Sequence, residues 1–208
     1  MHWTLNEWIY NVKNLTLSDE ELFFDNGNSK KLKVIFGESP YPSNPFALTN
    51  YFGFSEVAFF NEEYKMAFLS ILNILFGSTD NAIFFLKNMK LPNQNRFDSQ
   101  LLKNFVYLLY TQENIILVNR NDINKKKKHI YRSSAITNIL SNTSVALVVG
   151  RNYSTNIVRD LSQRQIYHDI IVHPSSILYG GGNQQTINDY FNTYYEFSPS
   201  ILSMFKIL

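Results

Sequence analysis

The sequence predicts an α/β protein, a three-layer α/β/α sandwich with a central four-stranded parallel sheet. Four short β-rich apolar runs, each suited to one buried strand, alternate with segments whose apolar residues recur at helical spacing. Polar or glycine-containing turns follow all four runs, and ligands bind beyond such strand ends in open parallel sheets. The 208 residues, 45% of them hydrophobic, can bury one large core, so we expect a single domain over residues 1–208.

Two short helices are expected in the N-terminal segment, residues 1–31, because helical spacing is followed by a helix-start pattern. The core spans residues 32–195, and residues 196–208 form a C-terminal tail. Phe84 and Phe85 are expected in the core. In chain order we expect a strand over 32–36, a proline-rich loop over 41–50, helices over 62–76 (ended by Gly77) and 99–110, a strand over 114–118, a polar loop over 120–128, a helix over 133–140, a strand over 145–149, a helix over 155–161, a strand over 169–172 and a helix over 186–195.

Composition excludes several classes of site. Cysteine is absent, which rules out disulfides, cysteine-based metal sites and thiol chemistry. The four histidines show no ligand spacing, so no metal and no other cofactor is expected. The chain starts without a signal-peptide pattern and has no apolar run long enough to cross a bilayer, so we expect a soluble intracellular protein without a membrane partner. A net charge of +2 neither requires nor forbids a nucleic-acid partner.

The turns after the four strands carry the residues of a candidate site. They read Gly-Glu-Ser at 37–39, Asn-Arg-Asn at 119–121, Gly-Arg-Asn at 150–152 and His-Pro-Ser at 173–175. Because the carboxyl ends of parallel strands meet at one edge of a sheet, these turns can face one pocket. A carboxylate, amides and an imidazole together suit the hydrogen-bonding edge of a polar heterocycle. A single such turn is not specific, since every α/β protein must turn.

Motifs in a fixed order add a family resemblance. A Gly-x-x-Pro-Tyr turn follows the first strand, a Gly-Phe-Ser turn lies at 53–55, Ile-Leu-Val-Asn ends the second strand at Asn119, and an aliphatic strand ends at Gly150 with Tyr153 close by. His-Pro-Ser follows the fourth strand. In this order, from about residue 32 to 191, the chain resembles the uracil-DNA glycosylase superfamily.

The resemblance implies a function and a set of base-binding residues. Members flip uracil or a related modified base out of DNA and hydrolyse its N-glycosidic bond without a cofactor. By resemblance, Tyr41 closes the pocket against the C5 edge of uracil, and Phe54, or alternatively Phe52, stacks on the flipped base. Asn119 hydrogen-bonds the Watson–Crick edge, and His173 donates to O2 as the leaving base gains negative charge. A fixed donor of this kind is a strong source of transition-state stabilisation.

DNA is therefore the expected partner, and two segments are expected to contact it. A run of four lysines after the second strand suits phosphates near the pocket mouth, although a solvated loop is its simpler interpretation. An apolar residue after His-Pro-Ser can replace the flipped base in the duplex, where it offsets the cost of extrusion. The expected DNA-binding residues are Lys125, Lys126, Lys127, Lys128, Ser175, Ser176, Ile177 and Leu178.

The candidate catalytic residues are Glu38, Ser39 and His173, and one of them departs from the family pattern. The best-known branch has Gly-Gln-Asp-Pro-Tyr-His, whose Asp positions the attacking water; Ser39 stands in its place here and Glu38 replaces the Gln. Other branches carry Gly-Glu-x-Pro and are active. Two alternatives stay open. One is a catalytically silent relative that serves as a DNA-binding or protein-binding module, such as a replication accessory. The other is an unrelated nucleotide-binding protein, but the sequence contains no phosphate-binding glycine motif that would favour it.

Overall fold

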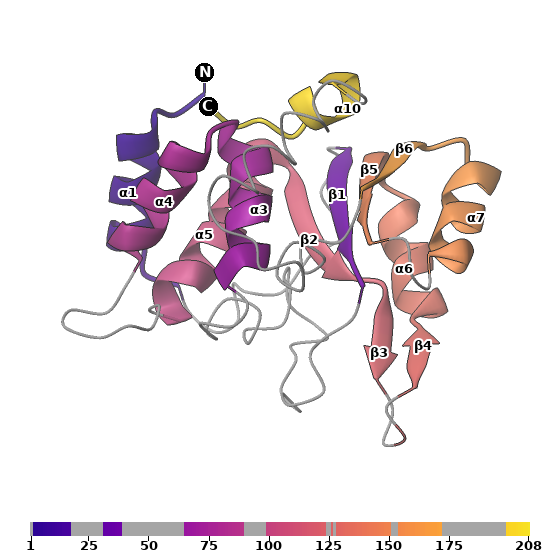
Figure 1. Cartoon of the computed structure of the whole chain (residues 1–208). Coiled ribbons are helices and arrows are strands. Elements are labelled where there is room, and N and C mark those ends of the chain that lie inside the picture. The colour runs from indigo at the N-terminus through magenta and orange to yellow at the C-terminus, as the bar shows by residue number, and fades with distance from the viewer. Residues whose placement is uncertain are drawn as a thin grey trace.

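A four-stranded, all-parallel sheet lies at the centre of the computed structural model (Figure 1). The structure describes residues 2–17, 31–38, 65–89, 99–123, 126, 128–150, 154–171 and 199–208. The strands are β1 Leu32–Gly37, β2 Ile115–Asn119, β5 Thr143–Val149 and β6 Tyr167–Ile171. They lie in the order β2-β1-β5-β6, so β1 is flanked by two strands that come much later in the chain. The predicted fold class, α/β with a central four-stranded parallel sheet, is confirmed.

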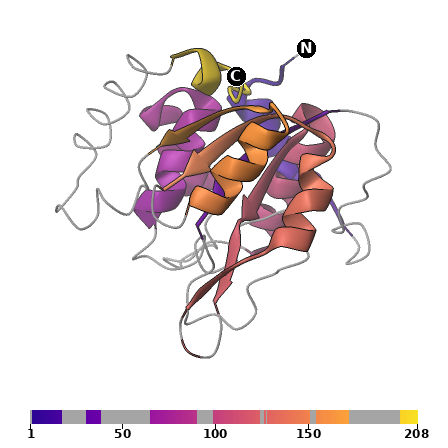
Figure 2. The ribbon, with the colours of Figure 1, turned by 90° about the vertical axis from the view of Figure 1, so that its right-hand side faces the viewer.

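Helices cover both faces of this sheet, which gives the three layers (Figures 1 and 2). One face is covered by α1, α3, α4 and α5, and the other by α6 and α7. A short C-terminal helix, α10, lies near the ends at which the strands begin (Figure 1). The bounds of the helices are α1 Leu5–Asn14, α3 Lys65–Phe76, α4 Thr79–Asn88, α5 Ser99–Glu113, α6 Ser133–Leu140, α7 Thr155–Gln163 and α10 Pro199–Ser203.

Side chains of each strand alternate between two hydrophobic cores. On β1, Ile35 packs against the layer that holds α1 and α5, while Val34 and Phe36 pack against α6 and α7. This alternation explains why β1, β2 and β5 are apolar at successive positions, since both faces of these strands are buried. The larger core also contains fully buried aromatic rings; the centroids of Phe85 and Phe105 are 4.6 Å apart. Removing such rings typically costs about 3–5 kcal/mol, so they contribute strongly to stability.

Most of the described elements were predicted from the sequence. All four strands of the sheet are confirmed, with small shifts at their ends. The helices expected over 62–76, 99–110, 133–140 and 155–161 correspond to α3, α5, α6 and α7 within the described residues. Gly77 directly follows α3 with φ +65°, a backbone conformation that glycine adopts without steric cost.

Two parts of the chain fold differently from the expectation. The polar loop expected over 120–128 is wrong in part, because Asn121–Ile123 (β3) pairs antiparallel with His129–Tyr131 (β4). Helix α4 was not predicted. It begins only two residues after α3, and the Ser78 hydroxyl caps it by accepting from the Asn81 backbone N–H at 3.4 Å.

The C-terminal tail contributes to the core. Its residues Leu202 and Phe205 are fully buried, so the last turn of the chain belongs to the packed structure. Phe85 is buried as expected, but the expectation for Phe84 is wrong because 48% of its surface is exposed. The helix start in the N-terminal segment, the loop over 41–50 and the helix over 186–195 lie outside the described residues.

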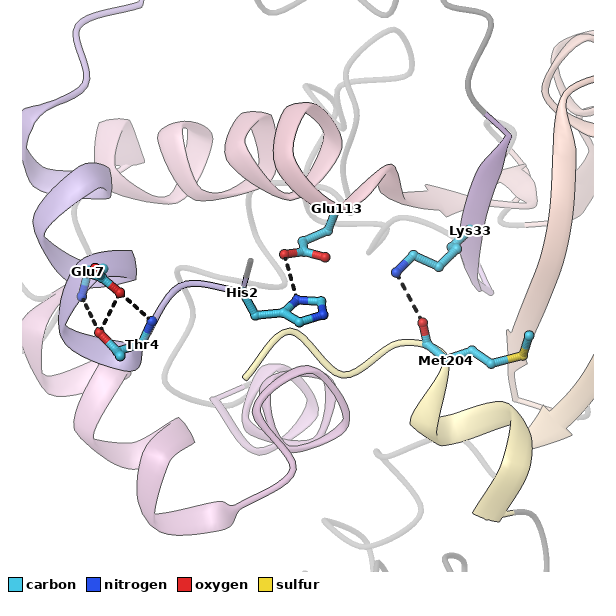
Figure 3. A network of polar contacts seen from close by, with 6 residues as sticks. All are labelled: His2, Thr4, Glu7, Lys33, Glu113 and Met204. Atoms are coloured by element: carbon cyan, nitrogen blue, oxygen red, sulfur yellow. Dashed lines mark hydrogen bonds and ion pairs between the residues drawn. The ribbon is translucent and has the colours of Figure 1, made fainter.

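Polar contacts join both ends of the chain to the amino edge of the sheet, where the strands begin (Figure 3). Lys33, on β1, donates from Nζ to the backbone oxygen of Met204 at 3.1 Å. Partial burial lowers the pKa of Lys33, and the negative charge of Glu113 opposes that shift. On the other side, His2 Nδ1 lies 3.3 Å from a carboxylate oxygen of Glu113. These contacts hold both ends of the chain beside the amino edge of the sheet.

The N-terminus of α1 is closed by a capping box (Figure 3). The Thr4 backbone N–H and hydroxyl donate to the Glu7 carboxylate at 2.7 and 2.8 Å, and the Glu7 backbone N–H donates to the Thr4 hydroxyl at 3.3 Å. The hydrogen bonds from Thr4 lower the pKa of Glu7. The arrangement satisfies backbone donors that the helix cannot satisfy itself.

Among the described helices, none is long and apolar enough to serve as a membrane span.

Candidate functional site

The carboxyl edge of the sheet gathers polar side chains from the ends of two adjacent strands, β1 and β2. Glu38 directly follows β1, and Asn119 is the last residue of β2, opposite Gly37 in the register. Backbone hydrogen bonds continue past the strand ends: the N–H groups of Arg120 and Asn121 donate to the carbonyls of Gly37 and Glu38 at 3.0 and 3.1 Å. Glu38 and Asn119 are thereby held on adjacent strands at the same edge.

Asn119 has the features of a recognition group. It is only 7% exposed, and the alternation along β2 puts its side chain on the same face as Leu117. Its backbone carbonyl accepts from Arg132 Nη1 at 3.2 Å. Its side-chain amide, in contrast, has no hydrogen-bonding partner within the described residues. Buried amides normally find partners, so an amide without one among the described residues is a candidate for binding a ligand through its donor and acceptor groups.

Arg120 ties the strand ends together from inside the protein. It is fully buried, and its Nη1 donates to the carbonyl oxygens of Val149 at 2.8 Å and Phe36 at 3.4 Å. Its Nη2 donates to the carbonyl of Gly150 at 3.0 Å. One side chain from the end of β2 therefore fixes the ends of β1 and β5.

The charge of Arg120 is part of the electrostatics of this edge. Burial lowers the pKa of Arg120 to about 10, while the electrostatic interactions with Glu38 and, to a smaller extent, Tyr131 oppose the shift. The guanidinium is thus charged at neutral pH, and it attracts the Glu38 carboxylate. A carboxylate, an amide and a buried cation are therefore combined at one sheet edge.

A β-hairpin extends from this edge (Figure 2). The hairpin arm, residues 121–132, consists of β3, β4, the loop between them and Arg132. Lys126 and Lys128 are exposed in its loop. At its base the Tyr131 hydroxyl donates to Asp160 of α7 at 2.6 Å, and burial together with that hydrogen bond raises the pKa of Tyr131. Lys126 and Lys128 of the lysine run therefore lie between the two strands of a hairpin that begins two residues after Asn119.

The structure describes four of the residues predicted for the site. Glu38 and Asn119 lie together at the carboxyl edge, and Lys126 and Lys128 lie on the hairpin arm. Within the described part of the chain, no group of three or more metal-ligating side chains gathers. The remaining predicted residues lie outside the described ranges: Ser39, Tyr41, Phe54, Lys125, Lys127, His173, Ser175, Ser176, Ile177 and Leu178.

Arg120 is the residue that the sequence analysis left without a role. The only signal was an arginine directly after a buried strand, between two asparagines. Its partners lie 29, 30 and 84 residues away, so no local pattern reveals them. Burial of an arginine is uncommon, and here backbone carbonyls accept hydrogen bonds from its Nη1 and Nη2 groups.

The fold and this edge together define an α/β protein with a polar, charged candidate binding site at the carboxyl ends of a parallel sheet. Ligand binding at that position is the general rule for such sheets. No family model, curated protein or solved structure matches the chain.

Proposed function

We propose that this protein is a DNA glycosylase that flips uracil or a related modified base out of DNA and hydrolyses its N-glycosidic bond. The observation that carries the proposal is Asn119, a nearly buried amide at a strand end whose side chain has no partner among the described residues. An amide presents one donor and one acceptor, which match the Watson–Crick edge of uracil. The ordered motifs of the sequence assign the same residue to that contact.

The reaction needs groups that act on both sides of the bond that breaks. As the bond between the sugar C1′ and the base nitrogen breaks, the electron pair stays on the base and the sugar becomes cationic. Glu38 supplies negative charge for the sugar and for positioning the attacking water, whose oxygen bonds to C1′ and whose proton leaves. His173 donates a hydrogen bond to the oxygen of the departing base. No cofactor is needed for this hydrolysis.

Binding of the proposed DNA substrate is expected to weaken steeply with salt. Each lysine that neutralises a phosphate contributes about −0.9 to the slope of log affinity against log salt concentration. Replacement of Lys125, Lys126, Lys127 and Lys128 by Ala should therefore make this slope shallower by about 2 to 4 units. The measurement is fluorescence anisotropy of a labelled duplex over a salt series. An unchanged slope would show that the four lysines form a solvated loop without phosphate contacts.

A silent relative that binds DNA or protein without catalysis is the second candidate. The observation that favours it is Ser39, which stands where the best-known branch of the resembled family carries its water-positioning Asp. A hydroxyl cannot supply the negative charge that stabilises a cationic sugar. In this alternative the base would be recognised but not cut.

Two variants at neighbouring positions separate the candidates. Labelled oligonucleotides with uracil, hydroxymethyluracil, hypoxanthine or a thymine mismatch are incubated with each protein, and strand cleavage at abasic sites is measured. If the protein is an active enzyme that uses Glu38, the wild type cleaves the oligonucleotide. The rate of cleavage by Glu38→Gln is then lower by about 100-fold or more, because the amide keeps the shape of the carboxylate but not its charge. For a silent relative, only Ser39→Asp cleaves. The glycosylase proposal fails if neither the wild type nor Ser39→Asp excises any of the bases and if uracil-containing DNA is bound no more tightly than ordinary DNA.

A further inference from the structure

We infer that the hairpin arm binds the DNA backbone on one side of the flipped base, within about five base pairs of it. This inference rests on the proposed function only in placing DNA at the carboxyl edge of the sheet. The new part of the inference is the position of the phosphate contacts along the DNA, relative to the flipped base. Charge, reach and attachment of the hairpin arm each support it.

The positive charge of the protein is concentrated on the hairpin arm. Residues 121–132 contain four lysines and Arg132 against one carboxylate, Asp122, which gives a net charge of +4. The whole chain carries +2, so all the other residues together carry −2. A local charge of this size on an otherwise slightly acidic protein attracts a polyanion to that one place.

The reach of the arm follows from its strand geometry. Lys126 is five residues beyond Asn121, and a fully extended chain spans at most about 3.6 Å per residue, so Lys126 lies no more than about 18 Å from the edge. Successive phosphates of one strand are about 3.4 Å apart along a duplex axis. The exposed Lys126 and Lys128 can therefore contact phosphates no more than about five base pairs from the base held at the edge.

The arm is attached to the residues of the site by several hydrogen bonds. Asn121 Nδ2 donates to the carbonyl of Glu38 at 2.9 Å, and the backbone N–H of Arg132 donates to the carbonyl of Arg120 at 3.1 Å. The bond from Tyr131 to Asp160 joins the arm to α7. The base of both strands of the arm is therefore held against the site, which favours contacts at a limited distance from the base over general attraction.

DNA fits this surface better than an anionic membrane. Ile130 is the one large apolar side chain of the described hairpin that is exposed, at 50%, and a single aliphatic group gives little insertion into a bilayer. Closely spaced lysines match the regular phosphates of a nucleic acid. Vesicles of anionic phospholipid therefore serve as the competing partner in the test.

The test measures binding to duplexes of different length. Labelled duplexes carry one central uracil, and either flank is trimmed stepwise from ten base pairs to two. For the wild type, trimming one flank below about five base pairs should weaken affinity about tenfold, and trimming the other flank should not. Lys126→Ala/Lys128→Ala should bind the longest duplex about tenfold more weakly and be insensitive to trimming on that flank. Circular dichroism and the melting temperature check that both proteins are equally folded.

A matched variant removes the same charge elsewhere. Lys13 and Lys87 are exposed on α1 and α4, in the layer opposite α7, so Lys13→Ala/Lys87→Ala should behave as the wild type. The inference is overturned if this control loses as much affinity as the hairpin variant, if both flanks matter equally, or if the wild type binds anionic vesicles but no duplex. A protein that shows the flank dependence but cuts no base would keep this inference and lose the glycosylase activity.

Discussion

Asn119→Ala and His173→Ala should each lower cleavage of uracil-containing DNA by about 2–4 kcal/mol in transition-state stabilisation, roughly 30- to 900-fold in rate. The first change removes a contact to the edge of the base, and the second removes the donor to the leaving oxygen. Asn119→Ala should leave the free energy of unfolding nearly unchanged, because the amide makes no hydrogen bond within the described residues. Single-turnover kinetics and urea unfolding measure the two effects separately.

An amide on the surface provides the control for Asn119. Asn138 is exposed on α6, and Asn138→Ala should retain full activity. If Asn119→Ala and His173→Ala both stay within threefold of the wild type, neither residue has the proposed role. If Asn119→Ala is inactive because it unfolds, the amide is structural.

Arg120 should respond very differently to replacement by Ala and by Met. Arg120→Ala leaves a cavity and three carbonyls without their donor, so we expect a loss of about 3–5 kcal/mol in the free energy of unfolding. Arg120→Met fills much of the space and removes a charge whose burial is itself unfavourable. Burial lowers the pKa of Arg120 to about 10, well below the usual value of a guanidinium, and this cost of burying the charge offsets much of the lost hydrogen bonding. We therefore expect Arg120→Met to lie within about 1.5 kcal/mol of the wild type.

The sign of the pKa shift agrees with this expectation. Burial lowers the pKa of Arg120 in the folded state to about 10, below its value in the unfolded state, so the folded state carries the cost of the buried charge at neutral pH. Activity should nevertheless fall in Arg120→Met, because the side-chain hydrogen bonds that join the end of β2 to the ends of β1 and β5 are then lost. Urea unfolding and cleavage assays together test this. A stable and fully active Arg120→Met would show that Arg120 does not position the site.

The parts of the fold that were predicted from sequence depend on local patterns. Val34, Ile35 and Phe36 form a run that is apolar at every position, which only a strand buried on both faces requires. The spacing of apolar residues and the Gly77 stop likewise identify α3. Glu38 and Asn119 could be assigned to one edge because parallel strands end on the same side.

The parts that were missed depend on distant contacts. The strands of the hairpin arm are three residues each and mostly polar, so no apolar alternation marks them. Their pairing is supported at the base by Asn121, which bonds to Glu38, and by Tyr131, which bonds to Asp160, and both partners lie far away in the chain. The exposure of Phe84 beside a buried Phe85 depends on how α4 is rotated against the core, which the pair of phenylalanines does not reveal.

The position of β1 between β2 and β5 has a consequence for the synthesis of the protein. Ile35 pairs with Leu117 and Leu147, about 80 and 110 residues later in the chain. At about 5–20 residues per second, the ribosome delivers the second partner roughly 5 to 20 seconds after β1 itself. During that time an apolar strand emerges with both of its hydrogen-bonding edges open, and such strands aggregate readily. Slow translation, high temperature or strong overexpression should therefore favour inclusion bodies, and chaperones that shield nascent β-strands should raise the soluble yield.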